Sequence, residues 1–545
     1  MKLVSLSEMR TIEEEADASG LSYSAMMENA GYNLYREVLR LSYAKDDEED
    51  IQVLGLVGPG NNGGDTLIAL AHLAEKGWKA RAYLVKRKPG GDQLVKRLEE
   101  ADGEICPADK DTDFLQLATF IETADVVLDG VLGTGFKLPM KADIAKVLGA
   151  AKSSIEALEW PPLVVAVDCP SGVDCDTGLI AEECITADAT ITMAAIKKGL
   201  LKLPAYDIVG ELRVVEIGSL SKVKSWQNIA NEVLDETMAI SLLPDRPNDG
   251  YKGTFGTALI VAGSINYTGA ALLAGKAAYR IGTGLVTLAV ASPLHMILAG
   301  HLPEATWVLL PHEMGVIASE AADVLVANLD QATSMLIGPG LGLEDTTKEF
   351  ISNLFHKTIT KSTHGRMGFI PSDSNKESDA KANVIPSLIV DADGLKLLAK
   401  IKDWYKLLPE LTILTPHPGE MSILTGHKID EVQQDRLEFA RKYAREWGHI
   451  VVLKGAFTVI ASPDGRTTTI PVATPALAHA GTGDVLAGMI AGLRAQGMKA
   501  YDAARLGAWV HAQAGLIAAQ IQGSSAAVLA GDVLEAIPDV LAGLK

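Results

Sequence analysis

Short apolar runs separated by helical patterns recur along the first part of the chain. The runs lie at residues 51–57, 79–85, 125–129, 163–168, 189–193 and 212–217. The stretch at 66–74, which follows the first run, is rich in Ala and Leu and has the character of a helix. Continuous apolar runs are typical of strands that are buried on both faces. The pattern therefore predicts a parallel sheet covered by helices.

A second series of the same kind begins at residue 258. Its apolar runs lie at 258–263, 285–290, 335–338, 388–391, 411–415 and 450–454, and a small-residue helix is expected at 270–280. Between the two series, residues 221–247 are polar and predict a connector. We therefore expect an α/β protein of two domains, 1–225 and 226–545. The charge run at 45–50 and the polar segment at 361–382 are expected to be loops on the surface.

The composition narrows the class of protein. The chain has 545 residues, a formal net charge of −20 and 48% apolar residues. The acidic balance argues against nucleic acid binding, because no basic excess neutralises phosphates. Acidic residues follow the N-terminus too early for a secretory signal, and no apolar stretch is long enough to span a bilayer. The four Cys residues lack metal-site spacing, so we expect free thiols and a cytoplasmic protein without a membrane partner.

The segment at 60–65, Gly-Asn-Asn-Gly-Gly-Asp, lies between the first predicted strand and the first predicted helix. Glycines let backbone N–H groups approach a ligand, and a helix N-terminus favours negative charge, so this turn predicts an anion site. Its Asn and Asp oxygens also suit a cation or sugar hydroxyl groups. The alternative is a tight strand-to-helix turn built from good turn formers.

Two similar turns follow later strands, at 129–136 and at 168–172. The carboxyl ends of parallel strands meet at one edge of an open sheet, where ligands bind. Asp129 and Asp168 each end an apolar strand, where a carboxylate is costly unless it has a partner or a function. The alternative is that they cap a turn or a helix. Together the three turns predict one binding crevice.

These three turns resemble the N-terminal domain of NAD(P)H-hydrate epimerases. The resemblance implies a potassium ion held by Asn62, Asp129, Ser171 and the backbone oxygen of Val131. Oxygen-only ligands suit such a hard cation. It also implies that the hydrated nicotinamide nucleotide contacts Asn61, Asn62, Gly63, Gly64, Asp65, Gly133, Thr134, Gly135, Phe136, Lys137, Leu138, Pro139 and Asp168. Asp168 is the candidate acid/base, because proton movement at the hydrated ring needs a positioned titratable group.

In the second domain, the segment Ala-Gly-Thr-Gly-Asp at 480–484 precedes a predicted helix at 485–493. Apolar residues at 485, 486, 489, 490 and 493 predict one buried face for that helix. Glycines at a helix N-terminus can cradle a transferring phosphoryl group, and Asp484 can take a proton from an attacking hydroxyl group. This pattern resembles ribokinase-like small-molecule kinases. The alternative is a glycine-rich helix cap.

Four further segments accompany this one: GPGLG at 338–342, DADGL at 391–395, TPHPGE at 415–420 and KGAFT at 454–458. The combination resembles the ADP/ATP-dependent NAD(P)H-hydrate dehydratases. It implies substrate contacts at Ala262, Gly340, Gly342, His417 and Asp484. It implies nucleotide contacts at Lys454, Gly455, Ala456, Phe457, Thr458, Gly481, Thr482 and Gly483. Taken singly, His417 is equally consistent with a packed loop histidine, and the role of Asp393 (metal through water, or a cap) stays open.

The two resemblances occur in the order found in fused bifunctional repair enzymes. They imply a Rossmann-like parallel-sheet domain followed by a ribokinase-like domain. The first would interconvert the R and S epimers of hydrated NADH and NADPH. The second would phosphorylate the S form from ADP and eliminate phosphate, with magnesium accompanying the nucleotide. A homo-oligomer is also expected.

Two other functions fit parts of the sequence. The first is a ribokinase-like vitamin or sugar kinase that uses ATP, which the GTGD segment alone would allow but which TPHPGE and GPGLG disfavour. The second is a non-catalytic binding module, since the N-terminal fold also occurs in scaffold proteins of RNA metabolism. The intact Asn62, Asp129, Asp168 and Ser171 and the acidic net charge argue against a scaffold.

Overall fold

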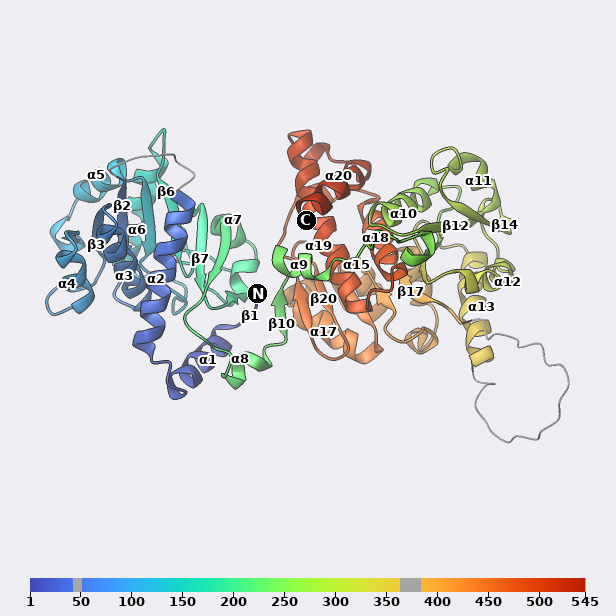
Figure 1. The fold of residues 1–545 in the computed structure, drawn as a ribbon, viewed down its shortest axis with the longest axis horizontal. Helices are drawn as coiled ribbons and strands as arrows, with labels where there is room; N and C mark the ends of the chain where they lie inside the picture. The colour runs from blue at the N-terminus through green and yellow to red at the C-terminus, as the bar shows by residue number, and fades with distance from the viewer. Residues whose placement is uncertain (43–50, 363–383, 545) are drawn as a thin grey trace. The chain divides into compact units, whose positions relative to one another are not determined.

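The computed structural model describes residues 1–42, 51–362 and 384–544. They form two compact units, Met1–Asn231 and Glu232–Lys545, which are coloured along the chain in Figure 1. The charge run at 45–50 and nearly all of the polar segment at 361–382 lie outside the described residues. All four Cys residues are buried free thiols, as the sequence predicted. None of the described helices is both long enough and apolar enough to cross a membrane.

The first unit is built on a seven-stranded sheet in which every neighbouring pair of strands is parallel. Its strands, in spatial order, are β4 (Glu104–Pro107), β3 (Lys79–Leu84), β2 (Gln52–Val57), β5 (Val126–Gly130), β6 (Leu163–Val167), β7 (Ala189–Met193) and β9 (Glu211–Val215). The order reverses between β2 and β5. Ligands of open α/β sheets bind at such a switch point, so the site is expected at the carboxyl ends of β2 and β5.

Helices cover both faces of this sheet. Val126 and Leu128 of β5 belong to one apolar core, and Val127 between them belongs to the other, because successive side chains of a strand point to opposite faces. The helices of the unit are α1 (Leu6–Ala18), α2 (Tyr23–Ser42), α3 (Asn61–Glu75), α4 (Gln93–Glu100), α5 (Leu115–Thr123), α6 (Ala142–Glu156), α7 (Tyr206–Val209) and α8 (Lys224–Asn228). The first core contains residues of α2 and α3, and the second contains residues of α5 and α6. The predicted parallel sheet with two covered faces is therefore confirmed.

The expected connector at 221–247 contains regular structure. Its first part packs on the first unit: the backbone N–H and the hydroxyl group of Ser225 both donate to Glu15, and Lys2 Nζ lies 2.7 Å from the carbonyl oxygen of Ile229. Its second part holds β10 (Asn231–Val233), an edge strand of the second sheet, and α9 (Glu236–Leu242). The division between the units therefore falls after Asn231, six residues beyond 225.

The second unit is built on a ten-stranded sheet. Its strands, in spatial order, are β10, β21 (Thr467–Thr469), β20 (Val459–Ala461), β19 (Ile450–Leu453), β18 (Ile413–Leu414), β17 (Ser387–Val390), β16 (Ser334–Ile337), β11 (Thr257–Val261), β12 (Leu285–Ala291) and β13 (Thr306–Leu310). From β19 to β13 all neighbours are parallel, and β20 and β21 add antiparallel pairs. The short strands β14 (His312–Glu313) and β15 (Val316–Ile317) form a separate hairpin.

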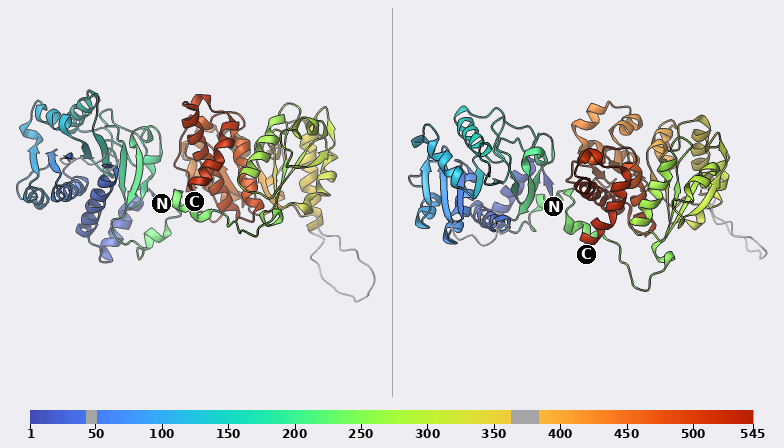
Figure 2. Two further views of the ribbon diagram at one scale, coloured as in Figure 1. Left: turned by 45° about the horizontal axis from the view of Figure 1, so that its top comes forward. Right: turned by 90° about the horizontal axis from the view of Figure 1, so that it is seen from above.

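Four helices contribute many residues to the second core: α10 (Thr268–Arg280), α18 (Thr482–Ala495), α19 (Ala500–Gln522) and α20 (Ala530–Gly543). Helices α18, α19 and α20 lie side by side, and Figure 2 shows them in red. The other helices include α11 (Ser292–Leu298), α12 (Ala321–Val326), α13 (Asp345–Ser362), α14 (Asp393–Leu398), α15 (Pro418–Thr425), α16 (Ile429–Gln434) and α17 (Arg436–Trp447).

The prediction of one buried face for the helix after GTGD is wrong. Every residue of α18 from Val485 to Leu493 is buried. The helix packs on β11, β16 and β17 between α10 and α19, and a Cβ atom at Gly488 would stand 2.2 Å from the carbonyl oxygen of Ala274. Small residues on the face toward α10 therefore allow the two helices to pack closely, and no face of α18 is left for solvent.

Candidate active sites

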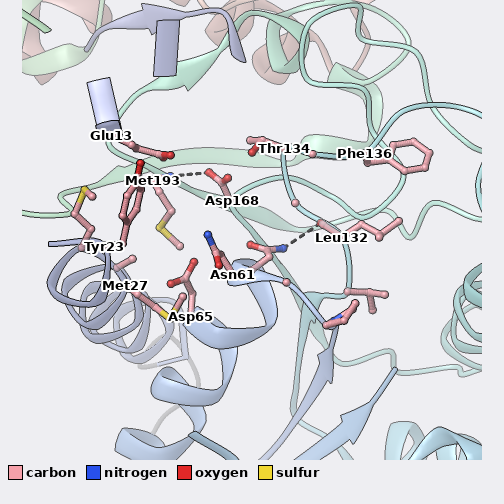
Figure 3. Close-up of a pocket in the computed structure, with 18 of the residues that line it drawn as sticks. Glu13, Tyr23, Met27, Asn61, Asp65, Leu132, Thr134, Phe136, Asp168 and Met193 are labelled. Carbon is pink, nitrogen blue, oxygen red and sulfur yellow. Dashed lines mark hydrogen bonds between the residues drawn. The ribbon is translucent and has the colours of Figure 1, made fainter. Parts of the chain in front are cut away.

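The first unit contains a cavity of about 1190 Å³ at the carboxyl ends of its strands. It is lined by α1, α2 and α3 and by the loops after β2, β5, β6 and β7 (Figure 3). The predicted site residues that line it are Asn61, Asn62, Asp65, Val131, Gly133, Thr134, Gly135, Phe136, Lys137, Pro139 and Asp168. The structure thus brings the three predicted turns together around one space. Leu138 stands in the same loop, 39% exposed.

The segment Asn61–Asp65 is the beginning of a helix rather than a separate turn. Helix α3 begins at Asn61, and Gly60 is its N-cap. Gly63 and Gly64 are buried, and a Cβ atom at Gly63 would stand 2.1 Å from the carbonyl oxygen of Gly58. These two glycines therefore allow close packing beneath the cavity, while Asn61, Asn62 and Asp65 face it.

Two oxygen atoms beneath the cavity have no hydrogen-bond donor in the described part of the chain. They are Oδ1 of Asn62 and Oδ1 of Asp129, both fully buried. The other amide and carboxylate atoms are engaged: Asn62 Nδ2 donates to the carbonyl of Leu132 at 3.0 Å, and the N–H of Ser171 donates to Asp129 Oδ2 at 2.7 Å. Burial raises the pKa of Asp129, against the hydrogen bonds from Ser171. Buried oxygens without donors suit a hard cation, so the chemistry of this donor set fits one.

Asp168 stands directly after β6 with a left-handed backbone conformation (φ 63°). Its Oδ1 accepts hydrogen bonds from the hydroxyl group of Thr192 (3.1 Å) and the N–H of Met193 (3.0 Å), and it forms an ion pair with the ammonium group of Lys197. These three donors fix the carboxylate at the wall of the cavity. A carboxylate held in this way is suited to proton transfer with a bound ligand.

Lys197, whose side chain is only 1% exposed, was not predicted to be a site residue. It lies in β8 (Ile196–Lys197), which pairs with β1 (Leu3–Val4), and its Nζ also donates to Thr192 and to the carbonyl of Met193, both at 2.9 Å. The available signal was a lysine in the apolar stretch that follows the strand at 189–193. A lysine buried in such a stretch needs a carboxylate partner.

The N-terminal helices also contribute cavity residues that the sequence did not suggest, including Glu13 of α1 and Tyr23 of α2. Burial raises the pKa of Glu13, and Lys197 opposes this shift. The pKa of Asp65 is raised well above its ordinary value by burial and by the negative charges of Asp168 and Glu13. The carboxyl groups of Glu13, Asp65 and Asp168 all line this cavity, and the buried ammonium group of Lys197 pairs with Asp168.

In the second unit, the predicted segments converge on a cluster of charged side chains at the carboxyl ends of β17, β18 and β19. Lys454 Nζ lies 2.6 Å from Asp391 Oδ1 and 3.7 Å from Glu420 Oε2. The hydroxyl group of Thr415 donates to Asp391 Oδ1 at 2.7 Å. Burial lowers the pKa of Lys454, but the negative charges of Asp391 and Glu420 have the larger combined effect. The pKa of Lys454 is therefore raised. The ammonium group of Lys454 is thus held by protein carboxylates.

Asp484 lies in the first turn of α18, whose N-cap is Gly481. Burial, followed by the charge of Asp391, raises the pKa of Asp484 to about 7, and Lys454 opposes the shift. A Cβ atom at Gly483 would stand 3.5 Å from Lys454 Nζ, which places the GTGD segment against the charged cluster. A carboxyl group whose pKa is raised to about 7, in the first turn of a helix, has the properties of a general base for phosphoryl transfer.

The remaining predicted residues of this unit lie around the same cluster. His417 is the N-cap of α15: its Nδ1 accepts from the N–H groups of Gly419 (3.0 Å) and Glu420 (3.3 Å). Asp393, whose role was open, accepts from the N–H of Gly342 at 3.1 Å and so ties the DADGL segment to GPGLG. The next residue after Ala262, Gly263, donates to the carbonyl of Pro339 at 2.8 Å.

The KGAFT segment forms the predicted loop between two strands, β19 and β20. The Thr458 hydroxyl group donates to the carbonyl of Gly455 at 2.9 Å and closes this loop. Arg436 was not predicted to be a site residue; its Nη2 donates to the carbonyl of Leu453, just before the loop, at 2.9 Å. Burial lowers the pKa of this arginine to about 10. Arg436 is thus a buried support behind the loop.

Comparison with known proteins shows that the chain belongs to a class of fused enzymes with two α/β domains. A family described as NAD(P)H-hydrate dehydratase matches residues 258–362 and 371–539, and one described as YjeF-related protein N-terminus matches 23–199. The chain belongs to the family of bifunctional NAD(P)H-hydrate repair enzymes, and the resemblance inferred from the motifs is confirmed.

Two curated relatives illustrate the match. The bifunctional NAD(P)H-hydrate repair enzyme of Moorella thermoacetica is 35% identical, covering 100% of this chain and 97% of the relative. That of Escherichia coli is 30% identical, covering 92% of this chain and 86% of the relative. Among solved structures, the ADP/ATP-dependent NAD(P)H-hydrate dehydratase of Bacillus subtilis, co-crystallised with ATP and Mg²⁺, is 29% identical with a TM-score of 0.46. It covers 58% of this chain, and 99% of that protein is matched.

Proposed function

We propose that the chain repairs hydrated NADH and NADPH in two steps. The first unit interconverts the R and S epimers of the hydrate, and the second converts the S epimer to NADH or NADPH with ADP, releasing AMP and phosphate. One observation carries the proposal: each unit holds a positioned carboxyl group, Asp168 or Asp484, at the carboxyl ends of a parallel sheet. The family of the chain supplies the reaction to which these groups are suited.

The proposed dehydration begins at Asp484. Its carboxylate takes the proton of the ring hydroxyl group as that oxygen attacks the terminal phosphate of ADP. The N-terminus of α18, where Gly481 and Gly483 lie, stabilises the charge that develops on the phosphoryl oxygens. Phosphate then leaves and the neighbouring ring carbon loses a proton to solvent, which restores the double bond of the dihydropyridine ring. This step is favourable because phosphate is a far better leaving group than hydroxide.

We place magnesium on the nucleotide. The cluster around Lys454 contains the carboxyl groups of Asp391, Asp393, Glu420 and Asp484, an excess of negative charge that suits a nearby cation. Magnesium bound to the nucleotide would neutralise charge on the transferring phosphoryl group. The choice of ADP rather than ATP rests on the fusion to an epimerase unit.

In the first unit we propose that Asp168 transfers a proton at the hydrated ring. The predicted potassium ion would be held by Asn62, Asp129, Ser171 and the carbonyl of Val131. The two buried oxygens without donors, Asn62 Oδ1 and Asp129 Oδ1, support this assignment. The ion would add positive charge below the substrate and hold the loops after β2, β5 and β6 together. A homo-oligomer and a cytoplasmic location stay predictions from the sequence.

One experiment tests the proposal directly. The enzyme is incubated with hydrated NADH and ADP, and the absorbance of the reduced ring is followed. Both epimers should disappear with wild-type enzyme. With Asp168→Asn only the S epimer should disappear quickly, because an amide cannot transfer a proton. A small-molecule kinase would instead phosphorylate a vitamin or sugar from ATP and leave ring absorbance unchanged, which would refute the proposal.

A further inference from the structure

Two carboxyl groups with different surroundings point into the cavity of the first unit. Asp168 comes from the turn after β6 and Asp65 from one turn into α3, and Figure 3 shows both facing the same space. The Asp168 carboxylate receives donors from Thr192, Met193 and Lys197. Among the described residues, no group donates a hydrogen bond or an ion pair to the Asp65 carboxyl group, which is 8% exposed.

These surroundings differ in the donors that they supply. The ammonium group of Lys197 and two hydrogen-bond donors all contact Oδ1 of the Asp168 carboxylate, so this group is held as an acceptor. Burial first, then the negative charges of Asp168 and Glu13, raise the pKa of Asp65 well above its ordinary value, and Lys197 only partly opposes them. The cavity thus favours the proton-bearing form of Asp65. Two carboxyl groups whose environments separate their charge states are the usual arrangement for an acid and a base.

We propose that Asp65 is a second catalytic residue, the general acid of epimerisation, with Asp168 as the general base. This inference rests on the proposed epimerase function of the first unit and assigns Asp65 a role beyond substrate binding. The two side chains approach the ring from different elements, α3 and the turn after β6, so a proton can be delivered by one and taken by the other.

The step balances without an oxidant. Asp65 gives its proton to the hydroxyl oxygen on the ring carbon beside the ring nitrogen. The nitrogen lone pair forms a C=N bond as the C–O bond breaks, and water leaves behind a cyclic iminium ion. A second water attacks the other face of that carbon, the C=N pair returns to nitrogen, and Asp168 takes the proton of the attacking water. Solvent in the cavity returns the proton from Asp168 to Asp65.

The first test compares Asp65→Asn with wild type in the full-length enzyme. The amide keeps the shape but has no proton to give, so kcat for epimerisation should fall by about 10²–10⁴-fold with little change in KM. The wild-type rate should fall at high pH as Asp65 ionises, and the residual rate of the variant should lack that fall. Asp65→Glu, which restores an acid, should recover part of kcat and the fall at high pH. Wild-type kcat in Asp65→Asn would overturn the proposal.

Glu13→Gln tests the competing acid, because Glu13 faces the same charges. The proposal would be overturned if the epimerisation rate of Glu13→Gln no longer fell at high pH while that of Asp65→Asn still did. Glu13 would then be the general acid. Circular dichroism and thermal melting of each variant establish that it is folded. If Asp65→Asn does not fold, Asp65→Glu and the labelling test below decide whether Asp65 is the general acid.

The second test uses ¹⁸O-labelled water. Breaking the C–O bond predicts one solvent oxygen in each molecule that has changed epimer, above the level from the uncatalysed reaction. Epimers that keep their original oxygen would overturn the acid role, because a route through ring opening does not release the hydroxyl group. Failure of the wild-type enzyme to epimerise at all would instead refute the proposed function, so the two failures are distinguishable.

Discussion

The ammonium group of Lys197 forms a buried ion pair with the carboxylate of Asp168, although the two residues lie on different elements of the first unit. Lys197 also donates to the carbonyl of Met193 at 2.9 Å, so the lysine, the carboxylate and the end of β7 are joined. The pair determines where the carboxylate points and leaves neither buried charge without a partner. It therefore links the stability of this unit to its chemistry.

Removal of Lys197 should lower both the stability of the first unit and its epimerase activity. Lys197→Met leaves the Asp168 carboxylate without its cation, which should cost about 3–5 kcal/mol of stability, as for other broken buried pairs. Epimerisation should be lost as well. The double variant Lys197→Met with Asp168→Asn should regain much of the stability, because no uncompensated charge remains, but no activity. Urea denaturation gives the stabilities; additive losses in the double variant would show that the pair is not energetically coupled.

Potassium should stabilise the first unit through the oxygens of Asn62 and Asp129. At a hundred times its Kd, a bound ion adds about 2.7 kcal/mol, so the melting temperature should be higher in potassium chloride than in tetramethylammonium chloride. Asp129→Ala should remove this difference and weaken substrate binding. Equal melting of the wild-type enzyme in both salts would contradict the ion site.

Dehydration of the S epimer should depend on pH through Asp484. The base acts in its ionised form, so kcat should rise with pH through about 7, the pKa to which burial and Asp391 raise it. Asp391→Asn removes the nearest negative charge and should move this midpoint to lower pH. Asp484→Asn should lower kcat by about 10²–10⁴-fold at every pH while ADP still binds. Asp539→Asn, an exposed change on α20, is the matched control and should leave the midpoint unchanged.

The two halves should work separately. A fragment of residues 1–231 should epimerise the R hydrate, and one of 232–545 should consume only the S hydrate. A fragment that ends at 225 should be less stable than one that ends at 231, because it lacks Ile229, whose carbonyl accepts from Lys2 and whose side chain belongs to the first core. Rapid consumption of both epimers by the second fragment, beyond spontaneous epimerisation, would refute this division.

Much of the fold could be predicted because strands that are buried in a parallel sheet have continuous apolar sequences. Every predicted run from 51–57 to 450–454 overlaps a strand. Some missed strands lack this signal in their composition, such as β21, which is Thr-Thr-Thr, and the edge strand β4, but the apolar strand β13 was missed as well. The strand β10 was taken as part of the connector because its three residues, Asn-Glu-Val, form no apolar run; it pairs with β21 at the edge of the second sheet.

The sequence by itself determined which turns carry the chemistry, since glycines and carboxylates at strand ends are local features, and it placed Asp168 and Asp484 in them. Only the tertiary structure decided which charged groups surround them. Lys197, Glu13 and Asp65 come from three separate elements, and Lys454 meets Asp391 across 63 residues of chain. Burial and the distance between charges set a pKa, and neither quantity exists until the chain has folded.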